Sequence, residues 1–158
     1  MTTSDERVSR DVFASPFNAL LALRMVGWMI VLPLAKHVLP FERLARVMWR
    51  GRAGRSSRVQ QTFVIRLASR LTRFSGSNCL ERSLILYRYL GLCGADPTLV
   101  LGLGKGQLRR RDGHAWLVVD GAPLIETQAE LDAYEPFVAF GPGARRLSDP
   151  AASATTVR

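Results

Sequence analysis

The chain has 158 residues, of which 47% are hydrophobic and 22% are charged, and this fits one globular domain with a real core and argues against a second. The net charge of +9 lies in the N-terminal half: residues 1–75 hold 13 basic and four acidic side chains, whereas residues 76–158 hold nine of each. This basic half either attracts an anionic partner or simply solvates the outer faces of helices. Aromatic residues do not interleave with the arginines as a single-strand groove requires, so we expect no nucleic-acid binding.

The chain has two cysteines, Cys79 and Cys93. If the segment between them is helical, their Cα atoms lie roughly 21 Å apart, which excludes a disulfide between them. With only His37 and His114 besides, and no closely spaced cysteine pair, we expect no structural zinc site, no cofactor and a reducing, cytoplasmic setting.

The first 75 residues predict a disordered start and a helical region. Residues 1–15 are polar and should be disordered, and residues 16–75 should form helices at about 17–35, 40–50 and 58–74, with a linker at 51–57. In the first helix 15 of 19 residues are apolar, although Arg24 and Pro33 argue against a clean membrane span. Three interpretations stay open for it: a buried or partner-covered helix, a membrane-inserted or interfacial helix, and a targeting segment.

A new helix is predicted to begin at Cys79. Asn78 can cap it, and Glu81 stands three residues later, as in a capping box. The helix should run to about Leu92 and end before Gly94.

The pattern then changes to strands. We expect strands at 99–103, 114–119 and 124–128, with a loop at 104–113 and a hairpin turn at Asp120-Gly121. The residues from Gly141 onward, rich in small and polar types, should be disordered. The predicted fold class is α+β, with N-terminal helices and the Cys79 helix packed on a small antiparallel sheet.

Two residues are candidates for chemistry. A thiol at the start of a helix lies at the positive end of the dipole, which favours the thiolate, although Cys79 could equally be a small buried hydrophobe. His114 follows a glycine at a strand edge and is the candidate base, or else a core histidine. We interpret Cys93 as a core residue and His37 as structural.

Glu126 is a third candidate, and the face of the sheet on which it lies depends on the length of the hairpin loop. If the loop is residues 120–122, Glu126 lies opposite Trp116, diagonal to His114 and on its face of the sheet. A two-residue loop would put Glu126 on the opposite face. Asp120 shares strand parity with His114 but lies roughly 20 Å along the strand and is the weaker choice. In chain order, Cys79, His114 and Glu126 supply the nucleophile, base and orienting group of an acyl-transfer site.

Three segments together resemble a known family: residues 78–84 (NCLERSL), 99–102 (LVLG) and 114–121 (HAWLVVDG). The resemblance, over about residues 15–142, is to the lasso-peptide maturation protease, the C-terminal domain of the microcin-processing B protein, within the transglutaminase-like superfamily. It implies a papain-like core at 76–140 that removes the leader from a ribosomally made precursor peptide. By position it assigns attack to Cys79, proton transfer to His114 and orientation to Glu126, where the family usually has aspartate.

The resemblance also implies partners. These are the precursor peptide, a separate leader-recognition protein of winged-helix type and an ATP-dependent cyclase resembling asparagine synthetase. From the charge asymmetry and the apolar stretch, we expect the two partner proteins to dock on the arginine-rich face or the first helix. Two alternatives stay open: another acyl transfer or deamidation by the same residues, and a non-catalytic basic or membrane-associated protein.

Overall fold

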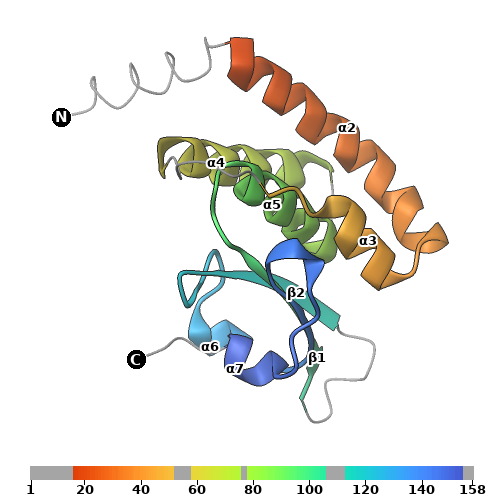
Figure 1. Ribbon diagram of the computed structural model, residues 1–158, viewed down its shortest axis with the longest axis vertical. Helices are drawn as coiled ribbons and strands as arrows, with labels where there is room; N and C mark the ends of the chain where they lie inside the picture. The colour runs from red at the N-terminus through yellow and green to blue at the C-terminus, as the bar shows by residue number, and fades with distance from the viewer. Residues whose placement is uncertain (1–15, 52–57, 76–77, 106–112, 155–158) are drawn as a thin grey trace.

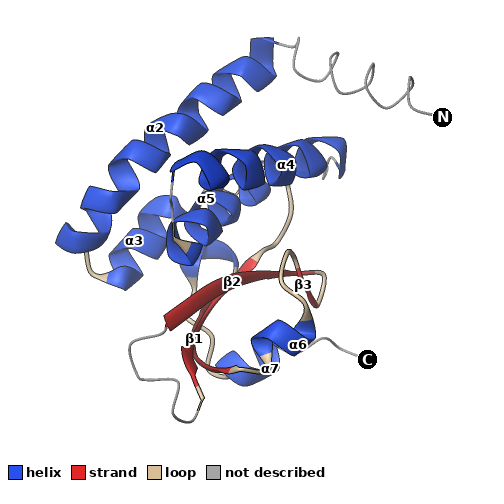
Figure 2. Ribbon diagram, turned by 180° about the vertical axis from the view of Figure 1, so that it is seen from behind, coloured by secondary structure: helices blue, strands red, loops and turns tan. Residues whose placement is uncertain are grey.

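A computed structural model describes residues 16–51, 58–75, 78–105 and 113–154. The predicted disordered residues 1–15 and most of the predicted linker and arginine-bearing loop lie outside these ranges. Four helices lie on one side of a sheet and two short helices lie near its other side (Figure 1). Viewed from behind and coloured by secondary structure, the same arrangement separates into a helical layer and a sheet layer (Figure 2). The α+β prediction is therefore confirmed.

The four larger helices agree with the sequence predictions to within a few residues. They are α2 (Pro16–Val38), α3 (Phe41–Met48), α4 (Arg58–Ser75) and α5 (Cys79–Leu92). Helix α2 continues three residues past its predicted end and contains Pro33. Most of α5 is buried, because it packs against the other three helices and the sheet.

Residues at its two ends determine where α5 begins and where it stops. The Asn78 side chain accepts a hydrogen bond of 3.0 Å from the backbone N–H of Glu81, which confirms the predicted cap. The Glu81 carboxylate does not complete a capping box; it pairs instead with Lys36 of α2 at 2.7 Å. Gly94, at φ +76°, turns the chain after the helix, as the sequence indicated.

The sheet has four antiparallel strands in the order β3-β2-β1-β4. They are β1 (Thr98–Gly104), β2 (Gly113–Val119), β3 (Ala122–Pro123) and β4 (Tyr134–Phe140). Since successive side chains point to opposite faces, Leu117 joins the main core beneath the larger helices, whereas Trp116 and Val118 join a second core with α6 (Gln128–Leu131) and α7 (Pro150–Ala154).

The hairpin after β2 corrects one prediction. Val119 pairs with Ala122, so the loop has two residues, not three. Asp120 and Gly121 both have positive φ, +53° and +78°, as a tight hairpin turn of this kind requires. The predicted return strand at 124–128 is also wrong: β3 ends at Pro123, the chain bends, and Thr127 caps α6.

The C-terminal part of the chain corrects the prediction of disorder from Gly141 onward. Residues 141–154, predicted to be disordered, form a short 3-10 helix at Pro142–Ala144, a bridge between Phe140 and Arg146, and α7. Strand β4 was not predicted, because Glu135 and Pro136 interrupt its apolar pattern. It nevertheless pairs with β1 along its length, with one irregularity beside Gly102.

Gly102 provides a test of the packing around the sheet. A Cβ atom added there would lie 2.8 Å from the ring of Trp116, which is 1% exposed, so Gly102→Ala forces the indole to shift. We expect the free energy of unfolding, measured by urea denaturation, to fall by about 1–3 kcal/mol. Gly27→Ala is the control: nothing lies within 4 Å of its added Cβ, and alanine in a helix should cost no stability. Equal stability of Gly102→Ala and wild type would contradict this packing.

Candidate active site

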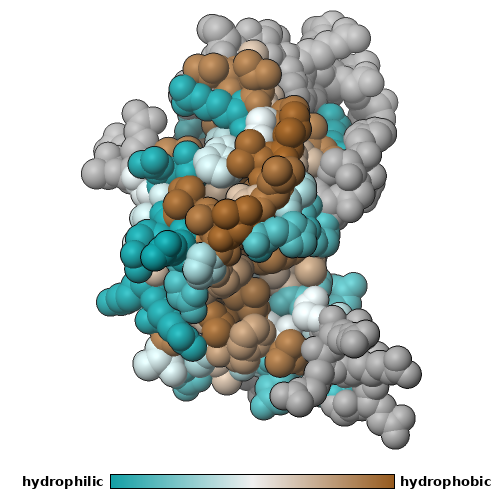
Figure 3. Space-filling view, turned by 90° about the vertical axis from the view of Figure 1, so that its right-hand side faces the viewer, coloured by the Kyte–Doolittle hydropathy of each residue, from teal (hydrophilic) through white to brown (hydrophobic). Residues whose placement is uncertain are grey.

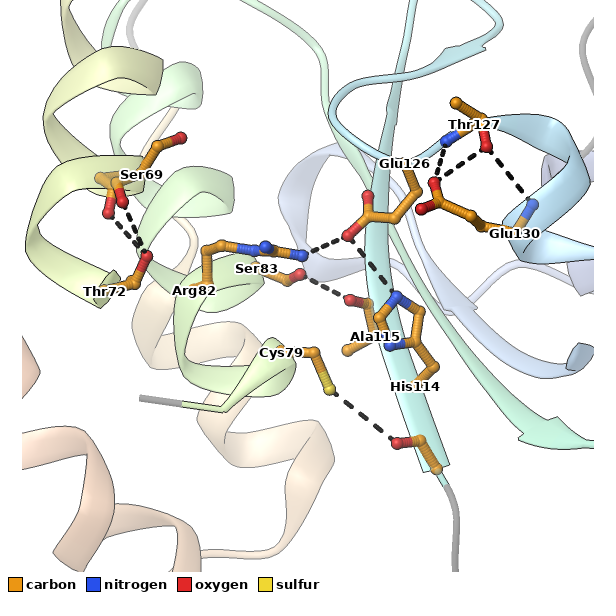
Figure 4. Close-up of polar contacts among 12 residues, drawn as sticks. Ser69, Thr72, Cys79, Arg82, Ser83, His114, Ala115, Glu126, Thr127 and Glu130 are labelled. Carbon is orange, nitrogen blue, oxygen red and sulfur yellow. Dashed lines mark hydrogen bonds and ion pairs between the residues drawn. The ribbon is translucent and has the colours of Figure 1, made fainter. Parts of the chain in front are cut away.

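Cys79 lies where the start of α5 meets the start of β2 (Figure 4). Its Sγ is 3.9 Å from the carbonyl oxygen of Gly113. One turn further along α5, the Ser83 hydroxyl donates a 2.9 Å hydrogen bond to the Ala115 carbonyl. Both contacts hold the thiol against the strand that carries the histidine.

His114 follows Gly113 on β2, with its imidazole near Cys79 (Figure 4). The ring stacks on Tyr134 of β4, with centroids 4.8 Å apart, and more distantly on Trp116 at 6.0 Å. Two aromatic neighbours from different strands restrict the plane of the imidazole. Sequence analysis did not identify Tyr134, because β4 itself was not predicted.

Glu126 reaches the histidine from the bend between β3 and α6. Its Oε1 lies 3.5 Å from Nε2 of His114, and the second ring nitrogen lies on the side of Cys79 (Figure 4). The alternative, Asp120, is exposed in the turn at the far end of β2. The structure thus brings Cys79, His114 and Glu126 together and leaves Asp120 apart.

The route by which Glu126 arrives differs from the predicted one. A two-residue turn would put residue 126 on the wrong face if β3 continued as a strand. Because β3 ends at Pro123, the side chains after it no longer alternate between the two faces of the sheet. The bend that follows brings the Glu126 carboxylate back to His114.

These contacts couple the charges of the three groups. The hydrogen bond to Cys79, followed by that to Glu126, raises the pKa of His114 to about 9. The same bond to His114 lowers the pKa of Cys79 against the opposing effect of burial, and the backbone amides of Ala115 and Leu80 act in the same direction. Both shifts favour a thiolate–imidazolium pair near neutral pH.

The third group is a carboxylate. Burial is the largest influence on Glu126 and favours the neutral acid, but the His114 hydrogen bond and the Arg82 charge outweigh it, so the pKa of Glu126 is lowered. An ionised carboxylate on the far side of the ring stabilises the imidazolium.

Comparison with known proteins agrees with this geometry. A sequence model described as the transglutaminase-like superfamily matches residues 19–139, well over half of the chain. The chain belongs to the transglutaminase-like superfamily. Members of this superfamily are typically cysteine peptidases or transferases. Searches against curated proteins and against solved structures gave no significant match.

Arg82 is a further component of this transglutaminase-like site that sequence analysis missed. Its Nη2 donates to the same Oε1 of Glu126 that faces His114. Residues three apart on a helix share a face, so the spacing of Cys79 and Arg82 was the available signal. The arginine links the helix that carries Cys79 directly to Glu126.

An open cavity of about 460 Å³ adjoins the histidine side of the site. Arg82, His114, Glu126 and Tyr134 are among its lining residues. Within the described residues, no group of three or more His, Cys, Asp or Glu side chains could hold a metal ion.

The other candidates lie elsewhere. Cys93 is buried in the main core, as predicted, and neither Cys79 nor Cys93 forms a disulfide. His37 is exposed near the end of α2.

The lowered thiol pKa predicts the reactivity of Cys79. Thiolates react with iodoacetamide and thiols do not, so we expect the alkylation rate of Cys79 to rise with pH through a midpoint below that of an ordinary cysteine. In His114→Ala the midpoint should move up, because the main stabilising bond is lost while burial remains. Cys93→Ser is the control, since Cys93 is buried and should contribute little labelling. Identical midpoints in wild type and His114→Ala would contradict the pairing.

The raised histidine pKa gives a second test. Glu126→Gln removes the negative charge beside Nε2, so the pKa of His114, about 9 in the wild type, should fall. The measurement is an NMR titration of the imidazole Hε1 resonance, assigned with a His37→Gln variant. Glu135→Gln, a matched change at an exposed residue of β4, should leave the titration unchanged. An unchanged His114 titration in Glu126→Gln would exclude this carboxylate as its partner.

Proposed function

We propose that this protein is a cysteine peptidase that removes the leader from a lasso-type ribosomal precursor peptide. The observation that carries the proposal is the meeting of a helix-start thiol, a strand-edge imidazole and a partly buried carboxylate in Cys79, His114 and Glu126. Superfamily membership supports acyl-transfer chemistry of this kind. The resemblance of residues 78–84 and 114–121 to the lasso-peptide maturation protease supports the substrate class.

The reaction proceeds through a thioester. The Cys79 thiolate attacks the scissile carbonyl carbon, and N–H groups at the start of α5 stabilise the oxyanion. As the C–N bond breaks, His114 gives its proton to the departing amine. It then takes a proton from water, whose hydroxide attacks the thioester, and the carboxylate product and Cys79 are released.

Glu126 and Arg82 act on the histidine rather than on the substrate. Glu126 occupies the Nε2 side of the ring, which leaves the other nitrogen toward Cys79. Arg82 holds Glu126 from α5. The pairing therefore selects both the tautomer and the orientation that proton transfer requires.

The proposal includes partners. A separate recognition protein of winged-helix type would bind the leader, and an ATP-dependent cyclase would act on the freed core peptide. The excess of basic side chains in residues 1–75 supports docking of an acidic surface there.

A related reaction would use the same thioester. If an amine attacks it, the outcome is amide transfer, and if the acyl group comes from a glutamine side chain, water gives deamidation. Superfamily membership is compatible with both outcomes.

Three substitutions test the roles. With precursor and recognition protein present, Cys79→Ala should lower kcat/KM for leader removal by roughly 10³-fold or more, and His114→Ala nearly as much. The loss in Glu126→Ala should be about 10- to 100-fold smaller, because it acts through the imidazole. Cys93→Ala is the matched control and should stay active. Circular dichroism should show that each variant is folded.

Intact-mass analysis of the precursor identifies the reaction. Two fragments mean peptidase action, whereas a small mass gain on an uncut chain means deamidation and would refute leader removal. Full activity in Cys79→Ala or His114→Ala would end the thiol mechanism altogether.

A further inference from the structure

The outward face of α2 is apolar along its whole described length. Its exposed large hydrophobic residues are Leu20, Leu23, Val26, Ile30, Val31, Leu34 and Val38. Between residues 19 and 38 the only exposed polar side chains are Arg24 and His37. Figure 3, which faces the side of the molecule on which α2 lies in Figure 1, shows apolar residues gathered in a band bordered by hydrophilic ones.

This band is long and continuous. Leu20, Leu23, Ile30, Leu34 and Val38 recur at intervals of three, four or seven, so they line one side of the helix. At 1.5 Å per residue the band extends about 27 Å. Soluble proteins rarely leave so large an apolar strip uncovered.

The opposite face of α2 is fixed to the protein. Met25 and Leu32 are fully buried in the main core, and Lys36 pairs with Glu81 of α5. Trp28 packs under the guanidinium of Arg88, 4.7 Å from the ring centroid. Among the described residues α2 is the one helix long and apolar enough to cross a membrane, but crossing would expose this core face. The helix is therefore built to lie along an apolar phase, not through it.

The helix that carries the band and two of its neighbours are rich in positive charge. Helices α2, α3 and α4 contain eight basic residues and one acidic residue, Glu42. Arg88 of α5 lies close enough to Arg24 and Arg50 for their charges to oppose its own. With Arg24 exposed on α2 itself, this excess of positive charge in the helical layer matches a surface of negative charge.

The scarcity of polar groups on the band favours lipid over a protein partner. Protein interfaces carry about one hydrogen bond per 100–200 Å², and the exposed side of α2 offers only Arg24 and His37 for such bonds. Acyl chains need no hydrogen-bond partners, and phosphate headgroups suit flanking arginines.

We propose that the outward face of α2 binds the surface of an anionic lipid bilayer, with the helix axis in the membrane plane and the neighbouring arginines on lipid phosphates. The arrangement is that of a monotopic protein, held to one leaflet. It is independent of the reaction catalysed at Cys79.

Vesicle co-flotation of the full chain tests the proposal. The probes are vesicles of phosphatidylcholine with about 30% phosphatidylglycerol, and vesicles of phosphatidylcholine alone. The wild type should float with the anionic vesicles and at least tenfold less with the neutral ones. The fraction of the double variant Ile30→Glu/Leu34→Glu that floats with the anionic vesicles should be at least tenfold lower than that of the wild type. These side chains are 70% and 71% exposed, so their replacement should not disturb the core. Phe137→Glu, at an exposed apolar residue of β4, is the control and should bind like the wild type.

Other outcomes would contradict the proposed binding of α2 to lipid. Wild type that stays unbound, or a double variant that binds normally, excludes this face as a lipid site. Gel filtration that shows a wild-type oligomer dispersed by the double substitution, without vesicle binding, assigns the face to a second copy of the chain. Protein that resists alkaline carbonate extraction from the vesicles would mean a spanning helix instead of an interfacial one.

Discussion

The contact between the start of α5 and the start of β2 is the constraint on which the site depends. Asn78 fixes where the helix begins, and Ser83 ties its second turn to the backbone of β2 at Ala115. These two contacts hold the start of α5 against the start of β2, so Cys79 and His114 lie next to each other. The chemistry thus rests on backbone and capping interactions that do not themselves react.

A chain of alternating charges extends outward from that contact. Arg82 holds Glu126, Glu126 faces His114, and His114 lowers the pKa of Cys79. Each partly buried charge has an opposite neighbour, which offsets the cost of removing it from water. Since Arg82 and Cys79 belong to one helix, the network starts and ends on α5, and a shift of that helix would move the nucleophile and the acid's anchor together.

The helical layer gives the protein two different surfaces. Helix α2 contributes Met25 and Leu32 to the core that supports α5, yet its other side is apolar and exposed. A helix that is apolar nearly all round fits the proposed double position, in which one face meets the core and the other meets lipid. The elements that carry Cys79 and His114 and the helix with the exposed apolar face are therefore joined through one core.

The sequence by itself determined the features that rest on neighbouring residues: the four larger helices, the cap at Asn78, the stop at Gly94, and strands β1 and β2. These follow from periodicity and local hydrogen bonding. Tertiary structure decided the rest. Glu126 was expected beside His114 from a register that is wrong, and it lies there because a bend after Pro123, not strand alternation, returns it to the imidazole. Strand β4, with Tyr134, and the ordered residues 141–154 are held by pairing and packing with distant segments, and no local pattern encodes such long-range contacts.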